Sequence, residues 1–293
     1  MRLFIQLVIE GIEGGSIYAL WAIGYGLVYQ VLGLMNFAFG DALLLSLYFI
    51  AGVVATTGMS PWLALVLAVV LIVFISTLIE RQVYSRFLSK GQGEAGFIAA
   101  LACAYILRNI ATAIWGQEPI QFPNFFGNHV FHVWGLEIAS GGLIVFGLAV
   151  SVMIALSVYL RITKIGRGIV LLGQDRTSAA LVGIPVRMIV TIVYGVSGAI
   201  GLLGAVLFAN QYQGVNSNLG FYITFQAFIV ATVGGAGSLA GSVIGGLTLG
   251  LVESLAIGYI SGSFAQALGW TAMAFMVMVR PQGILGRREI QRV

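Results

Sequence analysis

The chain contains hydrophobic runs that are far longer than the core segments of a soluble protein. No charged residue occurs between positions 16 and 40 or between positions 42 and 79. Only 8% of the 293 residues are charged, whereas a soluble domain of this length needs a charged fraction of roughly a quarter. A run of about 20 apolar residues crosses a bilayer as a helix. The sequence therefore predicts an all-α polytopic membrane protein that forms a single transmembrane domain over residues 1–293.

Glycine, proline and polar residues divide these runs into about eight membrane-spanning helices, some of them broken or re-entrant. We expect a break near residues 33–36, a turn at residues 56–61 and another turn at residues 234–241. Residues 81–94 are predicted to form an inner loop, and residues 117–139 an outer loop with a small hairpin. The expected spans are 16–40, two segments within 42–79, 97–115, 142–160, 188–209, two segments within 221–258, and 264–279, with 211–220 as a further outer loop or break.

Basic residues gather in three clusters between the hydrophobic runs, and these clusters hold twelve of the fourteen lysines and arginines. Because cytoplasmic loops of membrane proteins are enriched in Lys and Arg, all three clusters are predicted to face the cytoplasm, including the tail 280–293. The same segregation argues against a nucleic-acid partner, although the net charge is +4. The clusters are Arg81, Arg86 and Lys90; Arg161, Lys164, Arg167, Arg176 and Arg187; and Arg280, Arg287, Arg288 and Arg292.

The amino-terminal residues do not resemble a cleavable signal, because Glu10 and Glu13 interrupt their hydrophobic run. We expect this segment to be retained as an interfacial lead-in. Two full crossings within residues 16–57 would place the N-terminus outside, whereas a re-entrant or broken helix would place it inside. A break that contains glycine and asparagine is tolerated where it lines a cavity, which favours the inner side.

The central basic cluster, residues 161–187, is predicted to contain a short helix between positions 173 and 184. Asp175 or Thr177 is suited to cap its start, Gly183 suits a left-handed exit, and Pro185 prevents continuation. A short capped helix in a basic loop is typical of a docking element. An ordinary inter-helix loop whose charges only set orientation fits the same pattern.

Three ionisable residues lie at membrane depth, where such residues are functional candidates. Asp41 follows a break whose freed backbone groups would line a polar path, and it is also placed to cap the helix that starts at position 42. Glu253 is a candidate proton or sodium site. Arg108 is placed to meet a substrate carboxylate, to pair with Glu253 or to extend outward to the membrane surface, and we favour pairing or outward extension.

No residues indicate catalysis or metal binding. The acids are scattered, and His129 and His132 would lie on opposite faces of a strand without further ligands. Cys103 is the one cysteine, so no intrachain disulfide forms. No segment of the form G-x-x-x-x-G-K-[ST] occurs, so any ATP hydrolysis by a P-loop must come from another chain.

Glycine spacing carries two further signals. A weak repeat relates residues 14–48 to residues 198–232, because each is a glycine-rich run that leads into a break containing asparagine. Glycines at four-residue spacing predict close helix packing in lipid. These glycines are Gly237, Gly241 and Gly245, and Gly246 and Gly250.

Four blocks spread over the whole chain carry a family resemblance. They are GSIYALWAIGYGLVYQVLGLMNFAFGD at 15–41, GRGIVLLGQDRTSAALVGIPV at 166–186, VGGAGSLAGSVIGGLTLGLVESL at 233–255 and RPQGILGRRE at 280–289. In this order they resemble the inner-membrane permeases of branched-chain amino acid ABC transporters, specifically the shorter permease of the high-affinity leucine, isoleucine and valine system.

The resemblance implies a pore-forming, non-catalytic permease in the bacterial inner membrane that works by alternating access. It implies four partners: a second, longer permease, two cytoplasmic ATPase subunits and a periplasmic solute-binding protein. ATP and Mg²⁺ would bind the ATPases, and this chain would bind no cofactor. The short helix of the central cluster would be a cytoplasmic coupling helix, with Gly173, Gln174, Asp175, Arg176, Ala179, Leu181 and Gly183 as its contact residues.

The resemblance also bears on the substrate. Phe39 stands where the family commonly has a histidine, and Gln174 where it commonly has an acid. Because Phe39 supplies no hydrogen-bonding or titratable group there, urea, short amides and aromatic acids remain open as substrates beside branched-chain amino acids. A secondary transporter or channel-like facilitator, with Glu253 or Asp41 as coupling acid, remains the alternative function. The expected translocation path consists of Tyr18, Asn36, Phe37, Phe39, Asp41, Arg108 and Glu253.

Overall fold

The structure, a computed structural model, describes residues 2–88, 93–126, 130–133, 136–174, 176–235, 237–280 and 283–285. In this part of the chain seven helices are long and apolar enough to cross a membrane. They are built on α1 (Arg2–Leu32), α2 (Phe39–Thr57), α3 (Pro61–Ile79), α5 (Gly93–Trp115), α6 (Ser140–Ile162), α9 (Val186–Tyr212) and α11 (Leu239–Tyr259). Between and after them lie the shorter α10 (Leu219–Gly234) and α12 (Gly262–Val279). The predicted all-α polytopic class is confirmed.

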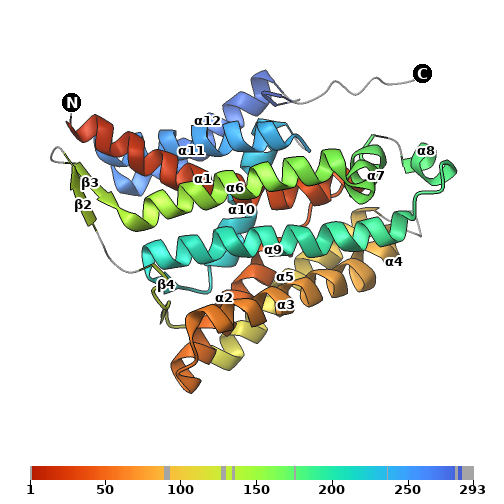
Figure 1. Cartoon of the computed structure of the whole chain (residues 1–293), viewed down its shortest axis with the longest axis horizontal. Coiled ribbons are helices and arrows are strands. Elements are labelled where there is room, and N and C mark those ends of the chain that lie inside the picture. Colours follow the sequence, from red (N-terminus) through yellow and green to blue (C-terminus); the bar gives the residue numbers. More distant parts are fainter. Residues whose placement is uncertain are drawn as a thin grey trace.

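The remaining elements gather at two opposite ends of the helix bundle (Figure 1). One end carries the hairpin of β2 (Val130–Val133) and β3 (Leu136–Ala139), and we call it the hairpin end. The other end carries α4 (Ser85–Leu88), α7 (Lys164–Leu172) and α8 (Arg176–Leu181). We call it the basic end, because two of the three basic clusters lie there.

The first residues of α1 lie at the hairpin end, where α1 contacts β3. This helix is uninterrupted over 31 residues, a length of about 46 Å. The chain turns only after Leu32, where Gly33 has a φ of 66°, and α2 then returns to the hairpin end. The break was predicted. The N-terminus lies at the hairpin end, because α1 begins beside β3. The predicted inner N-terminus and the predicted outer hairpin therefore do not fit together, and which side of the membrane this end faces stays a prediction.

Two helix pairs repeat one pattern in opposite directions. α1 runs from the hairpin end to the basic end, and α2 returns after a break at residues 33–38. α9 runs from the basic end to the hairpin end, and α10 returns after residues 213–218. The repeat keeps a spacing of 180 positions, as in Gly24 and Gly204, Asn36 and Asn216, and Gly40 and Gly220. The fold is therefore an inverted repeat of the kind found in membrane transporters.

The short return helices α2 and α10 cross at their first turns, inside the bundle. A Cβ atom on Gly40 would overlap the carbonyl oxygen of Gly220. The backbone N–H of Gly40 donates to Oγ1 of Thr224 at 2.9 Å. The preceding Phe39 lies against Gly24, eight residues before the end of α1, which is about 12 Å below that end. The crossing therefore lies at membrane depth.

Small residues also join α11 to its neighbours. Gly246 and Gly250 face α1, and a Cβ on either would collide with the α1 backbone. Gly241 and Gly245 face α10 in the same way. Gly237 was predicted to belong to the same series of closely packed glycines. It does not, because it precedes α11 in the turn after α10 and has a φ of 83°. That turn confirms the fold-back predicted at residues 234–241.

The predicted inner loop starts later than expected. The helix continues beyond α3 as a π-helix, η1 (Glu80–Tyr84), and then as α4. Tyr84 stabilises this extension, because its buried ring allows the hydroxyl to donate to the carbonyl of Met35 at 3.0 Å. The prediction of a loop over residues 81–88 is therefore wrong.

The central basic cluster is also more helical than predicted. Thr163 caps α7, and its Oγ1 accepts a hydrogen bond from the N–H of Gly166 at 2.9 Å. The short helix expected over 173–184 is α8, which ends at Leu181. Gly183 has the predicted left-handed conformation, with a φ of 83°, and α9 starts directly after Pro185.

The hairpin end contains two small antiparallel sheets. The predicted hairpin is formed by β2 and β3. A second pairing joins β1 (Ile120–Gln121) to β4 (Gly214–Val215) and was not predicted. Of the two histidines, His132 lies in β2, whereas His129 is outside the described residues. The described residues contain no group of three or more potential metal ligands.

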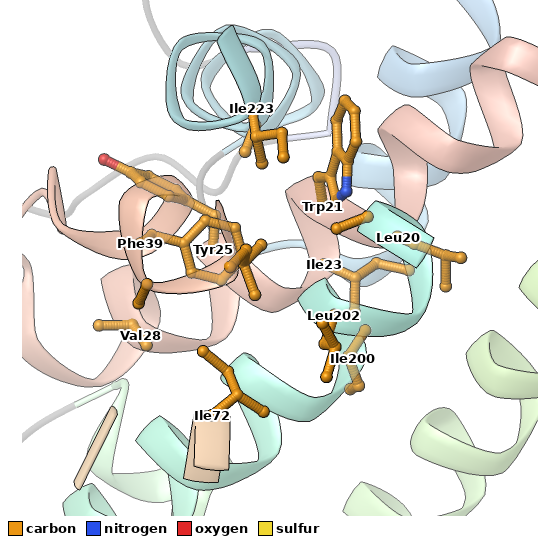
Figure 2. Close-up of a cluster of buried hydrophobic side chains, with 14 of the residues drawn as sticks. Leu20, Trp21, Ile23, Tyr25, Val28, Phe39, Ile72, Ile200, Leu202 and Ile223 are labelled. Atoms are coloured by element: carbon orange, nitrogen blue, oxygen red, sulfur yellow. The ribbon is translucent and has the colours of Figure 1, made fainter. Parts of the chain in front are cut away.

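The hydrophobic core surrounds the middle of α1. Figure 2 shows Trp21 and Tyr25 of α1 with Phe39 of α2, Leu202 of α9 and Ile223 of α10 gathered around them. All five side chains are buried, and the Tyr25 and Phe39 rings meet edge to face at 5.9 Å. The core therefore holds together the two halves of the inverted repeat.

We predict that Gly40→Ala strongly destabilises the protein, whereas Gly147→Ala does not. A Cβ at Gly40 has no room against the α10 backbone, and overpacking of this kind costs about 1–3 kcal/mol or more. Gly147 is also helical, and a Cβ there meets nothing within 4 Å. Thermal unfolding of the detergent-purified variants measures the difference. Equal melting temperatures would contradict the crossing geometry.

Candidate functional site

An ion pair lies directly beside the crossing of α2 and α10. Asp41 occupies the first turn of α2 and its side chain is 2% exposed. Arg108 of α5 donates from Nε to Oδ1 at 2.9 Å and from Nη2 to Oδ2 at 3.1 Å. The carboxylate also lies against Gly220, at the start of α10. A negative charge at a helix start is stabilised by the helix dipole, and the two-point contact with arginine adds to this.

This geometry corrects two of the alternatives. Arg108 does not pair with Glu253, because Asp41 is its partner. Asp41 does not cap a helix that starts at position 42, because α2 already begins at Phe39 and its cap residue is Ala38.

Arg108 keeps part of its guanidinium group accessible. The side chain is 22% exposed, and Nη1 makes no hydrogen bond with any residue that the structure describes. An arginine in mid-helix that faces neither protein nor water is costly in a membrane. Part of the guanidinium group of Arg108 therefore stays accessible on this face of α5, although Asp41 balances its charge.

A strip of partly exposed aromatic rings runs across the bundle from α5 to α12. Phe97 of α5 meets Phe37 at 4.9 Å between ring centres, and Phe37 meets Phe228 of α10 at 6.5 Å. Phe228 meets Phe225 at 6.5 Å, and Phe225 meets Trp270 of α12 at 5.2 Å. These five residues, which we call the aromatic strip, form a continuous apolar face on the short helix α10 and its neighbours.

The second buried acid, Glu253 of α11, is held by neutral donors. Its Oε2 accepts from the Tyr18 hydroxyl at 2.7 Å, and its Oε1 accepts from Nε2 of Gln226 at 2.8 Å. Trp270 donates in turn to Oε1 of Gln226 at 2.9 Å, and the hydroxyl groups of Tyr18 and Tyr222 are hydrogen-bonded at 2.8 Å. The network joins α1, α10, α11 and α12, and it contains no basic residue.

The expected path residues therefore separate into two groups. Phe37 and Arg108 lie on the partly exposed face beside α5. Buried within the chain are Tyr18, Asn36, Phe39, Asp41 and Glu253. Of the buried group, Phe39 packs against Gly24 and Gly201 between α1 and α9, within the core of the repeat, and its place on the path stays a prediction.

The expected coupling residues lie at the tip of the basic end, where α8 projects beyond the bundle (Figure 1). Ala179 is 3% exposed and anchors the helix. Leu181 is 84% exposed and Val182 is 79% exposed. Gly173 packs closely on Gln30 at the end of α1, and Gln174 is exposed. Arg176 begins α8, and Asp175 lies outside the described residues.

Sequence reasoning missed the partners of the buried acids and most of the aromatic strip. The spacing of Tyr222 and Gln226 places both on one face of a helix, as does that of Phe221 and Phe225. This spacing is the signal in the sequence that could have identified these residues. Nothing in the local sequence indicated which neighbouring helix these faces would meet.

Comparison with known proteins gives consistent results. Residues 7–279 match the family profile described as branched-chain amino acid transport system permease component. The chain is 28% identical to the high-affinity branched-chain amino acid transport system permease protein LivH of Escherichia coli, over 99% of this chain and 98% of that protein. It is 30% identical to the corresponding protein BraD of Pseudomonas aeruginosa, with the same coverage of both chains.

One solved structure is similar in fold. A chain of PsaBC from Streptococcus pneumoniae in complex with Fab matches with a TM-score of 0.51 and 16% sequence identity, over 95% of this chain and 92% of that chain. At this level of identity the similarity concerns the fold alone.

We predict that Asp41→Asn and Arg108→Gln each destabilise the protein by about 3 kcal/mol, because each leaves an uncompensated charge at membrane depth. The double variant should lose clearly less stability than the two single variants lose together, because it contains neither charge. The free energy of unfolding in detergent is measured for the unchanged protein, the two single variants and the double variant, which together form a double-mutant cycle. Strict additivity would contradict a direct interaction between the two side chains.

Proposed function

The chain belongs to the family of permease components of branched-chain amino acid transport systems, and on that basis we propose that it is the translocation subunit of an ATP-driven ABC importer. In this role it is non-catalytic and spans the bacterial inner membrane, with the basic end and the C-terminus in the cytoplasm. The placement of basic residues at that end supports this orientation. The names of the LivH and BraD relatives support a branched-chain amino acid as the solute.

The importer requires an external motor, because this sequence has no P-loop. We assign that role to two cytoplasmic ATPase subunits, which bind ATP and Mg²⁺. The observation that carries the assignment is the exposed apolar tip of α8. Leu181 and Val182 project from the basic end, beyond the bundle, where they face water in the absence of a partner. A cleft of an ATPase would bury them.

The segments on either side of α8 connect it to the two halves of the inverted repeat. The segment 182–185 joins α8 to α9, and α9 belongs to one half of the inverted repeat. Gly173, just before α8, packs on Gln30 at the end of α1, and α1 belongs to the other half of the repeat. Closure of the ATPases would therefore tilt both halves about the crossing of α2 and α10. Such a motion opens the path alternately to each side of the membrane.

The translocation path runs along the aromatic strip and past Arg108. We propose the longer permease as the chain that lies opposite the partly exposed face of Arg108. The strip suits apolar side chains, and the free Nη1 of Arg108 suits a carboxylate. A periplasmic binding protein would deliver the solute at the hairpin end. Branched-chain amino acids combine both chemical features, which favours them over urea or short amides.

We predict that Leu181→Ser reduces ATP-driven uptake at least tenfold, because it removes the apolar group that docks on the ATPase. Ile162→Ser is the matched control, because Ile162 is 71% exposed at the end of α6 at the basic end and lies outside α8. Uptake of radiolabelled leucine and copurification of the ATPases are measured for both. Normal coupling in the Leu181 variant would contradict the docking role.

We predict that Phe225→Ala reduces leucine uptake several-fold without loss of folded protein, because it opens a gap in the aromatic strip. Phe74→Ala is the control, because Phe74 is 63% exposed on α3, away from the strip. Proteoliposomes that contain the whole importer provide the assay. Liposomes with this chain alone should show no flux, and unaided flux would favour a secondary transporter or channel-like facilitator.

A further inference from the structure

Two adjoining cavities lie at the basic end, between the end of α3 and the start of α9. The first has a volume of about 700 Å³ and the second about 670 Å³. They share Arg81, Val186 and Arg187 in their walls. Neither contains a residue of the aromatic strip or the crossing, so they are separate from the translocation path described above.

The first cavity is basic and polar. Arg81, Arg86 and Arg187 line it together with Ser85, Gln82 and Tyr84. The side chains of Arg81 and Arg187 are exposed and make no hydrogen bond or ion pair with any residue in the described ranges. Arginine binds phosphate oxygens through two parallel hydrogen bonds, so the cavity is suited to a phosphate group.

The acid Glu80 in the wall of this cavity forms no ion pair with Arg81 or Arg187, all three of which lie in the described ranges. Glu80 is 1% exposed, and it accepts hydrogen bonds from Oγ1 of Thr191, at 2.9 Å, and from Ser85. Its oxygens are therefore directed into the protein. The accessible surface of the cavity carries the positive charges.

The second cavity is mostly apolar and continues along α9. Its wall includes Val186, Met188 and Ile192. Met188 and Ile192 are four residues apart and lie on one face of the helix. This face points away from the core, since Met188 is 56% exposed. An occupant of both cavities must combine an anionic head with an apolar chain.

We propose that the two cavities bind an anionic phospholipid, with its phosphate on Arg81 and Arg187 and an acyl chain along α9. A free phosphate would leave the apolar cavity empty. An acidic segment of a cytoplasmic protein would suit the arginines, but its charges would not match the apolar wall of the second cavity. The chemistry of the two walls together therefore selects a lipid of the inner leaflet.

The position of the site gives the lipid a structural effect. Arg81 belongs to η1, and Arg187 is the second residue of α9, just after the segment that joins α8 to α9. A phosphate held by both residues links the extension of α3 to the start of α9. The binding site itself does not depend on the proposed transport role, and its test requires no transport assay.

The test is native mass spectrometry of the full-length chain in detergent, titrated with phosphatidylglycerol, phosphatidylcholine or inorganic phosphate. Phosphatidylglycerol should bind in a one-to-one ratio, while phosphatidylcholine and inorganic phosphate bind at least tenfold more weakly. The double variant Arg81→Gln/Arg187→Gln should bind phosphatidylglycerol about 25-fold more weakly, because each arginine contributes about fivefold. Arg81→Lys/Arg187→Lys keeps the charge but loses the two-point contact, so it should be intermediate.

Arg280→Gln is the matched control, because it removes an exposed arginine that lines neither cavity. It should leave phosphatidylglycerol binding unchanged. An equal loss in this control would overturn the proposal in favour of diffuse charge attraction. Full displacement of phosphatidylglycerol by inorganic phosphate would also overturn it. So would a double variant that keeps the lipid but no longer copurifies with the ATPases, which would make the cavities a protein docking site.

Discussion

A helix that begins inside a membrane must satisfy its free backbone N–H groups without water, and this requirement shapes the centre of the protein. α2 and α10 both begin there. The N–H of Phe39 donates to the carbonyl of Asn36, and the N–H of Leu219 donates to the carbonyl of Asn216. The next N–H of α2, on Gly40, donates to α10. The free N–H groups at the start of these helices therefore bond either within a turn that begins at an asparagine or to the helix from the other half of the repeat.

The same junction determines where charge is tolerated. Two helix starts bring positive ends of helix dipoles close together, which favours a carboxylate nearby. Asp41 occupies that position, and Arg108 balances it from α5. Glu253 has no such arginine, and its charge is countered only by a hydroxyl and an amide. The two buried acids thus have different environments. The first belongs to the crossing, and the second links α11 to the helices around it.

Local sequence signals predicted the parts of the structure that depend on local chemistry. The break after Leu32, the left-handed Gly183 and the fold-back before α11 follow from glycine and proline, and they were predicted. The weak repeat was predicted with an offset of 184 positions, whereas the fold has 180. The difference of about one helical turn preserves the glycine pattern, so composition alone could not fix the register.

Contacts between distant segments were not predictable in this way. The sequence offered only Glu253 as a protein partner for Arg108, and Asp41 was not foreseen, because only the crossing of α2 and α10 brings it near α5. The extension of α3 through η1 was missed, because its arginines suggested a loop while Tyr84 stabilises a helix by contacting the break after α1. The side of the N-terminus depended on the direction of α2, which no local pattern encodes.

The distribution of exposed groups argues that this chain is only part of a transporter. Its own packing neutralises Asp41 and satisfies Glu253, so neither acid is left facing a path through the isolated chain. The groups left accessible are of a different kind. They are the outer part of Arg108 at membrane depth, the aromatic strip beside it, and the apolar tip of α8 in water. Arg108 is costly at membrane depth unless water or protein reaches it, and the tip of α8 is an apolar surface at the end of the bundle. The proposed second permease would cover the first two, and the proposed ATPase subunits would cover the third.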